Sequence, residues 1–206
     1  MSSYTTEQEN FWAQDFGKNY IDRNSIKDIL PAKLKFFSDI LPRVGGVTDI
    51  FEFGANIGIN LHALHTLLPK ANLKALEINP DAVKELRKND WLKEIQEGSL
   101  LEKSFPDQAD LVLTSGVLIY INPDKLEKAY QNIYDTSRKY ILLAEYYNPS
   151  PVSITYRGHN DRLFKRDFAG DMLEKFDNLR LIDYGFTYKR DPHFPLDDIT
   201  WFLMEK

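Results

Sequence analysis

The stretch Asp49-Ile50-Phe51-Glu52-Phe53-Gly54-Ala55-Asn56-Ile57-Gly58 decides the fold of this 206-residue chain. Its first half is an apolar run around one carboxylate, typical of a buried strand, and its two glycines predict a turn into a helix. The segment Ala75-Leu76-Glu77-Ile78 reads as a second strand that ends on a lone carboxylate. Open α/β sheets bind ligands at the carboxyl ends of their parallel strands, so we expect both carboxylates and both glycines to share one site.

Working outward, the chain alternates strands and helices. Strands are expected near residues 48–53, 73–78, 94–98, 110–114, 140–145, 179–186 and 199–205. Helices are expected over 7–23, after Pro31, over 58–68, from Asn79, from Asn122 and over 165–176. The last two strands leave no room for a crossover helix, which a parallel pair needs, so they predict an antiparallel hairpin. The result is an α/β fold with a doubly wound, mostly parallel seven-stranded sheet that ends in this hairpin.

Composition narrows the class of protein. The chain is 43% hydrophobic and 28% charged, as in ordinary globular proteins, and its length predicts one domain over 1–206. It contains no cysteine, which excludes disulfides, thiol nucleophiles and cysteine-held metals. The first residues lack a signal-peptide pattern, and no apolar run reaches the ~20 residues of a membrane span. We expect a cytoplasmic protein without a membrane partner, and the net charge of −5 argues against nucleic acid.

The charges at the expected site indicate the cofactor. The dinucleotide fingerprint needs a third glycine, and Asn60 stands at that position. A pyrophosphate would also face Glu52, and like unit charges ~4 Å apart repel by about 4 kcal/mol near a protein surface. The same carboxylate would attract the ammonium and the sulfonium of S-adenosylmethionine. Glu77 suits the two ribose hydroxyls of either cofactor and does not discriminate between them.

These motifs resemble those of the class I S-adenosylmethionine-dependent methyltransferases, over residues 47–206. Glu52-Phe53-Gly54-Ala55-Asn56-Ile57-Gly58 is similar to their glycine motif, and Glu77 to their ribose-binding acid. The resemblance implies a Rossmann-like fold with S-adenosylmethionine as cofactor and S-adenosylhomocysteine as product. The acidic residue usual near Ser99 in these enzymes is missing here. The implied cofactor contacts are Glu52, Gly54, Asn56, Gly58, Glu77, Ile78, Ser99, Leu100, Ser115, Gly116 and Val117.

Longer motifs resemble a narrower family, the pseudaminic acid biosynthesis-associated methylases. They lie over residues 11–24, 145–149 and 156–170. This resemblance implies a nonulosonic (pseudaminic) acid precursor or a nucleotide-activated sugar as the methyl acceptor. It also implies that residues 1–45 form an N-terminal helical cap. Within this cap, residues 11–24 would be a lid over the cofactor, in which Tyr20 and Arg23 hold the methionine carboxylate. The alternative is an amphipathic helix that only packs its aromatic side chains on the domain.

Residues 146–170 are expected to form a loop that covers the substrate, because they follow the last parallel strand. Its basic residues suit an anionic acceptor and its tyrosines suit stacking on a ring. The alternative is a solvated run of mixed charge, since aspartates alternate with the basic residues. The expected substrate contacts are Tyr146, Tyr156, Arg157, Arg162 and Lys165.

The expected catalytic residues are His159, Glu145 and Tyr147. Transfer to a hydroxyl benefits from a base with a pKa near neutral, which a histidine provides, whereas transfer to an amine needs mainly orientation. The alternative is that His159 only packs its loop. His62 and His65 share a helix face without a third ligand nearby, so no metal site is expected.

We therefore expect an enzyme that transfers a methyl group directly from S-adenosylmethionine to a small molecule. Two other functions stay open at this point. One is an NAD(P)-dependent oxidoreductase on a similar fold, and the other is a non-catalytic cofactor-binding module.

Overall fold

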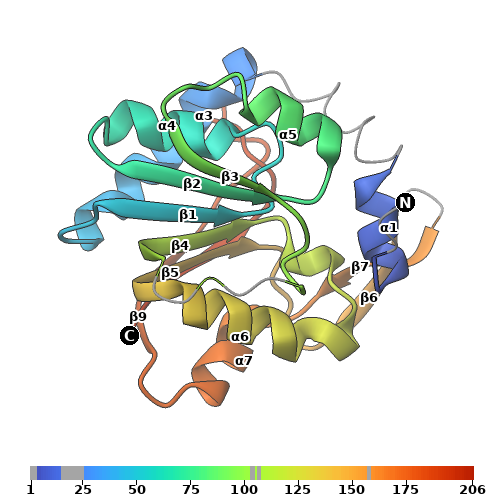
Figure 1. Ribbon diagram of the computed structural model, residues 1–206. Coiled ribbons are helices and arrows are strands. Elements are labelled where there is room, and N and C mark those ends of the chain that lie inside the picture. The colour runs from blue at the N-terminus through green and yellow to red at the C-terminus, as the bar shows by residue number, and fades with distance from the viewer. Residues whose placement is uncertain (1–3, 15–25, 103–104, 106–107, 157–158) are drawn as a thin grey trace.

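A computed structural model of the chain describes residues 4–14, 26–102, 105, 108–156 and 159–206. A seven-stranded sheet in the order β3-β2-β1-β4-β5-β9-β8 forms its centre. A separate pair of strands, β6 and β7, lies near the carboxyl ends of the parallel strands of this sheet (Figure 1). Within the described part, no helix is long and apolar enough to cross a membrane.

The five parallel strands are β1 (Asp49–Phe53), β2 (Asn72–Glu77), β3 (Leu92–Glu97), β4 (Ala109–Ser115) and β5 (Ser137–Glu145). β8 (Arg180–Phe186) and β9 (Thr200–Glu205) form the terminal hairpin, and β9 runs antiparallel to both β5 and β8. The central strands are buried on both faces, which explains their continuous apolar runs. The predicted fold is confirmed, including the single antiparallel strand.

Helices cover both faces of the sheet. α3 (Ile26–Ile40), α4 (Ile59–Leu67) and α5 (Pro80–Leu86) lie on one face, and α6 (Leu126–Thr136) and α7 (Phe168–Lys175) lie on the other (Figure 1). The helix starts predicted at Asn79 and Asn122 are correct, because each side chain accepts backbone N–H groups that follow it. At Asn122 one 3₁₀ turn, η3 (Pro123–Lys125), precedes α6.

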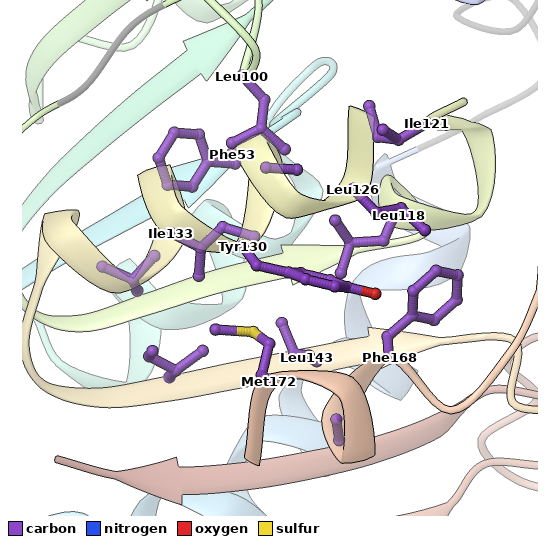
Figure 2. Close-up of a cluster of buried hydrophobic side chains, with 14 of the residues drawn as sticks. Phe53, Leu100, Leu118, Ile121, Leu126, Tyr130, Ile133, Leu143, Phe168 and Met172 are labelled. Carbon is purple, nitrogen blue, oxygen red and sulfur yellow. The ribbon is translucent and has the colours of Figure 1, made fainter. Parts of the chain in front are cut away.

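Two hydrophobic cores follow from this layering. The core under α6 and α7 is drawn in Figure 2, where Tyr130 of α6 lies above Met172 and Phe168 of α7. The Tyr130 hydroxyl donates to Asp171 Oδ2 at 2.7 Å, so this buried tyrosine keeps a polar partner. The second core packs α3 and α4 on the opposite face through residues such as Phe37.

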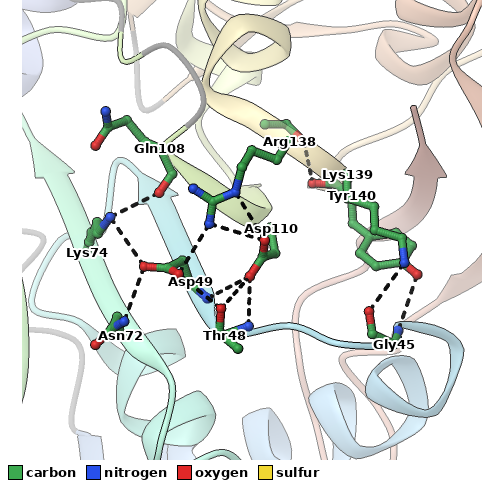
Figure 3. A network of polar contacts seen from close by, with 11 residues as sticks. Gly45, Thr48, Asp49, Asn72, Lys74, Gln108, Asp110, Arg138, Lys139 and Tyr140 are labelled. Carbon is green, nitrogen blue, oxygen red and sulfur yellow. Dashed lines mark hydrogen bonds and ion pairs between the residues drawn. The ribbon is translucent and has the colours of Figure 1, made fainter.

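A polar network fastens the amino ends of the strands, at the edge opposite the expected site (Figure 3). Arg138 of β5 forms ion pairs with Asp49 of β1 at 3.2 Å and with Asp110 of β4 at 3.1 Å. Although burial opposes it, N–H and hydroxyl donors from Thr48 and Asp49 hold the pKa of Asp110 at about 2. These contacts fix the relative positions of the strands whose other ends carry the site.

Three expectations on secondary structure need correction. α3 does not start after Pro31, because Pro31 lies inside a helix that already includes Ile26. α1 spans Glu7–Ala13, and the remainder of the helix expected over 7–23 lies largely outside the described residues. Residues 146–170 are not mainly a loop: β6 (Val152–Tyr156) and β7 (His159–Lys165) form an antiparallel pair there, before α7.

Candidate functional site

A cavity of about 480 Å³ opens at the carboxyl ends of β1, β2, β3 and β4. It is lined by the loops after these strands, by helices α1 and α3, by the start of α4, by the loop between β8 and β9 and by Tyr146 after β5. The sequence-predicted residues that line it are Glu52, Gly54, Asn56, Glu77, Ile78, Ser99, Leu100, Ser115, Gly116, Val117 and Tyr146.

The loop after β1 follows the glycine pattern closely. Gly54 and Gly58 have φ angles of +69° and +84°, which side-chain-bearing residues adopt at a cost. A Cβ on Gly54 would lie 2.5 Å from Val117 Cγ2, so the loops after β1 and β4 approach each other only because Gly54 has no side chain. Gly58 is the N-cap of α4 and does not line the cavity.

Glu52 is the central ionisable group of the site. Its side chain is 1% exposed, and its Oε1 accepts a hydrogen bond of 2.6 Å from Asn60 Nδ2. Burial raises the pKa of Glu52 to about 8, against the opposing effect of that hydrogen bond. Within the described residues, Glu52 Oε2 and Asn60 Oδ1 are both buried without a hydrogen-bond partner. Two adjacent acceptors in the cavity wall suit a ligand with several N–H donors, such as an ammonium.

Glu77 ends β2 beside this pair. Its Oε2 accepts the backbone N–H of Asn56 at 2.7 Å, and its Oε1 accepts that of Asn79 at 2.7 Å. Burial raises the pKa of Glu77, and the two N–H donors oppose that shift. The carboxylate is therefore held rigidly in the cavity wall, with lone pairs left for two ligand hydroxyls.

Glu145 lies below the cavity and does not line it. Its carboxylate accepts backbone N–H groups from Val117 at 3.1 Å, Leu118 at 3.2 Å and Ile119 at 3.4 Å. Burial raises the pKa of Glu145 to about 7, but these donors occupy both oxygens. The structure thus gives Glu145 a positioning part: it holds the turn before η2 (Leu118–Tyr120) under the cavity.

Helix α1 closes the end of the cavity near β2 and β3. Asn79 Nδ2 donates to the carbonyl of Trp12 at 3.0 Å, and the Trp12 ring lies 4.4 Å from that of Tyr120. Gln8 and Glu9 are its buried residues, and Ser99 Oγ donates to Glu9 Oε1. From the sequence, neither residue is predicted as part of the site. Thr6 and Glu9 match a capping box, so the glutamate is already explained by its role in starting the helix.

The opposite wall is formed by α3 and the β8–β9 loop, which sequence reasoning left without a function. Lys33 of α3 is half-buried there, and Lys189 and Asp197 line the same wall. Burial lowers the pKa of Lys33, while Glu52 and Asp197 oppose that shift. No motif signals these residues, since they come from a mixed-charge helix and a proline-rich loop.

The other predicted residues fall into two groups. Tyr147 and Lys165 do not line the cavity. Tyr147 is 40% exposed, and its ring lies 5.9 Å from that of Phe202. Lys165 Nζ lies 4.9 Å above the ring of Tyr146. β7 packs beside η2, which brings the β6–β7 hairpin to this edge. The remaining predicted residues cannot be placed. Tyr20, Arg23 and Arg157 lie outside the described residues, and of Tyr156, His159 and Arg162 the structure describes only the backbone.

The two histidines of α4 have a packing partner. The His65 ring stacks on Trp91 at 4.5 Å, and the His62 ring meets the same indole edge-on at 4.9 Å. In the described part of the chain, no three histidine or acidic side chains are grouped to hold a metal ion.

Comparisons with known proteins rest on structure. No protein-family model matches the chain, and no curated protein sequence does either. A Leishmania major S-adenosylmethionine-dependent methyltransferase of the DUF858 family matches with a TM-score of 0.72 at 16% identity, over 98% of this chain and 87% of that one. The magnesium protoporphyrin IX methyltransferase of Synechocystis, solved with bound S-adenosylmethionine, matches with a TM-score of 0.67 at 11% identity, over 100% of both chains.

A third similar structure is the plantazolicin methyltransferase in complex with S-adenosylhomocysteine. Its TM-score is 0.65 at 13% identity, over 97% of this chain and 93% of that one. At such identities the likeness establishes a common fold. The chain therefore has the Rossmann-like fold of S-adenosylmethionine-dependent methyltransferases.

Proposed function

We propose that the protein is an S-adenosylmethionine-dependent methyltransferase that acts on a small molecule. The observation that carries this proposal is the buried acceptor pair, Glu52 Oε2 and Asn60 Oδ1, in the wall of a cavity that also presents Glu77. An ammonium fits the pair and a ribose fits Glu77. The similar solved structures, all on this fold, add independent support.

The residues present fit the cofactor from end to end. Glu52 and Asn60 would hold the ammonium, the backbone at Gly116 leaves space for the chain of the methionine, and Glu77 would hold the ribose. Tyr20 and Arg23 remain our candidates for its carboxylate. When bound, the cofactor supplies a methyl group that its sulfonium already activates. The protein's part is then to align the nucleophile and to exclude water.

The acceptor would enter beside Lys33, where α3 and the β8–β9 loop form the wall of the cavity next to Glu52. The apolar side chains of Ile29 and Leu196 on this wall limit water around the reacting atoms. His159 is our candidate for a base if the acceptor is a hydroxyl. For an amine acceptor, orientation alone would suffice.

We further propose that the acceptor is a nonulosonic (pseudaminic) acid precursor or a nucleotide-activated sugar. The sequence resemblance over residues 11–24, 145–149 and 156–170 supports this choice. Two lysines on the acceptor wall, Lys33 and Lys189, agree with an anionic substrate, although Asp197 lines the same wall and Lys189 pairs with Asp198 at 3.5 Å. Tyr146, Tyr156, Arg157, Arg162 and Lys165 remain the proposed substrate contacts.

The test is incubation of the protein with isotope-labelled S-adenosylmethionine and a host metabolite extract. We expect one small molecule to gain the mass of a methylene together with the label. The Gly54→Val variant, whose side chain would collide with Val117 in the cavity wall, serves as the inactive control. Binding of NAD without binding of S-adenosylhomocysteine in calorimetry would favour the oxidoreductase, and binding without transfer to any metabolite would favour a non-catalytic module.

A further inference from the structure

We infer that Glu9 of α1 recognises the exocyclic amine of the cofactor's adenine base, a contact that rests on the proposed function. Glu9 lines the cavity and is 4% exposed. It lies 90 residues from Ser99 in sequence, yet the Ser99 hydroxyl donates to its Oε1. The recognition of the base would therefore come from the N-terminal helix and not from the loop after β3.

The order of the strands places the base at Glu9. The sheet order β3-β2-β1-β4 sets out the site along one edge: Glu52 is the last residue but one of β1, Glu77 ends β2, and Ser99 follows β3. With the ammonium at Glu52 and the ribose at Glu77, the base extends toward the loop after β3. The acceptor must meet the methyl group near Glu52, so it cannot occupy this end.

Glu9 keeps one acceptor position for the base. An ionised carboxylate has about four lone-pair positions. Glu9 Oε2 is occupied by Thr5 and Thr6, including the Thr6 backbone N–H at 2.8 Å. Glu9 lines the cavity, and among the described residues only Ser99 donates to Oε1, so Oε1 retains one lone pair. The 6-amino group of adenine is a donor of matching chemistry.

Two further contacts hold Glu9 in position. The capping box with Thr6 orients its side chain, and Ser99 Oγ is itself fixed by accepting the Leu101 N–H at 3.0 Å. The apolar side chains of Ile78 and Leu100 line the same end and are suited to the faces of a flat ring. Such an arrangement reads the edge of the base as well as its shape.

The experiment compares S-adenosylhomocysteine with its analogue in which hydrogen replaces the 6-amino group. Calorimetry gives the ratio of the two dissociation constants for each protein. We expect the wild type to bind the analogue at least about tenfold more weakly, as the loss of a hydrogen bond to a charged group predicts. In the Glu9→Gln variant this ratio should fall several-fold, because the acceptor is no longer charged.

Two variants on the same helix serve as comparisons. Glu7→Gln is the matched control, since Glu7 is exposed and outside the cavity lining, and its ratio should equal that of the wild type. Gln8→Leu tests the buried neighbour of Glu9. A wild-type ratio near one, an unchanged ratio in Glu9→Gln, or a ratio that falls only in Gln8→Leu would overturn the assignment. Failure of the wild type to bind either ligand would overturn the proposed function as well, which distinguishes the two.

Discussion

The Glu52→Gln substitution tests the electrostatics of the site. The side chain keeps its size, and its carbonyl can still accept from Asn60 Nδ2, but it cannot ionise. Glu52 has a pKa of about 8, so near pH 7 only about one tenth of the wild-type molecules carry the charge that an ammonium needs. The affinity of the wild type relative to that of the variant should therefore rise as the pH rises toward 9.

The magnitude follows from these populations. A hydrogen bond to a charged group contributes about 2 kcal/mol, or roughly thirtyfold in affinity. If the protonated wild type binds as the variant does, the wild type has an advantage of about fourfold near pH 7 and roughly thirtyfold near pH 9. Titration of the ligand's own amino group affects both proteins equally and cancels in this ratio.

Calorimetric titration of both proteins across this pH range measures the ratio, with Glu97→Gln, an exposed glutamate at the end of β3, as the control. A ratio that stays constant with pH would refute the assignment of the ammonium to Glu52.

The stability of the unliganded protein gives a second measurement. The folded pKa lies above the ordinary value of 4.5, so the contribution of Glu52 to stability is full below about 4.5 and is lost as the pH rises through about 8. The unliganded variant should then become more stable than the wild type across that window.

Three further predictions concern the frame of the site. Gly54→Ala should abolish cofactor binding in calorimetry, because its Cβ would lie 2.5 Å from Val117 Cγ2 at a φ of +69°; binding within about twofold of the wild type would contradict this close approach. Glu145→Gln should lower the free energy of unfolding by about 1–3 kcal/mol in urea titrations, because an amide donor would face backbone N–H groups; no loss would mean that the contacts do not hold the turn. Asn79→Ala should lower the free energy of unfolding by about 1 kcal/mol, because α5 loses its N-cap. It should also speed proteolysis of α1, because the hydrogen bond to the Trp12 carbonyl is lost. Unchanged proteolysis would show that α1 is held by other contacts.

The fold could be predicted from the sequence because its signals are local. The strand from Asp49 to Phe53, its glycine turn and the strand that ends at Glu77 each lie within a dozen residues, and adjacency in a parallel sheet joins them. Likewise, the connection between β8 and β9 is too short for a crossover helix, and this predicted that the two strands pair antiparallel. These features also predicted many of the residues that line the cavity at the carboxyl ends of β1, β2 and β4.

The rest depended on tertiary contacts that leave no pattern. Glu9 reaches Ser99 across 90 residues, and its capping role with Thr6 already accounts for it locally. The β6–β7 hairpin was missed because β7 carries charged residues at its start, which reads as a loop. Pro31 suggested a helix start, yet the packing of α3 against α4 carries the helix past a proline.

The account depends on a cationic amine being held by Glu52 while a ribose is held by Glu77. A crystal structure of the protein with S-adenosylhomocysteine tests this directly. The account predicts the homocysteine ammonium within hydrogen-bond distance of Glu52 Oε2 and Asn60 Oδ1, the ribose hydroxyls at Glu77 and the base beside Ser99. A ligand bound in the reverse direction, or elsewhere on the protein, would contradict it.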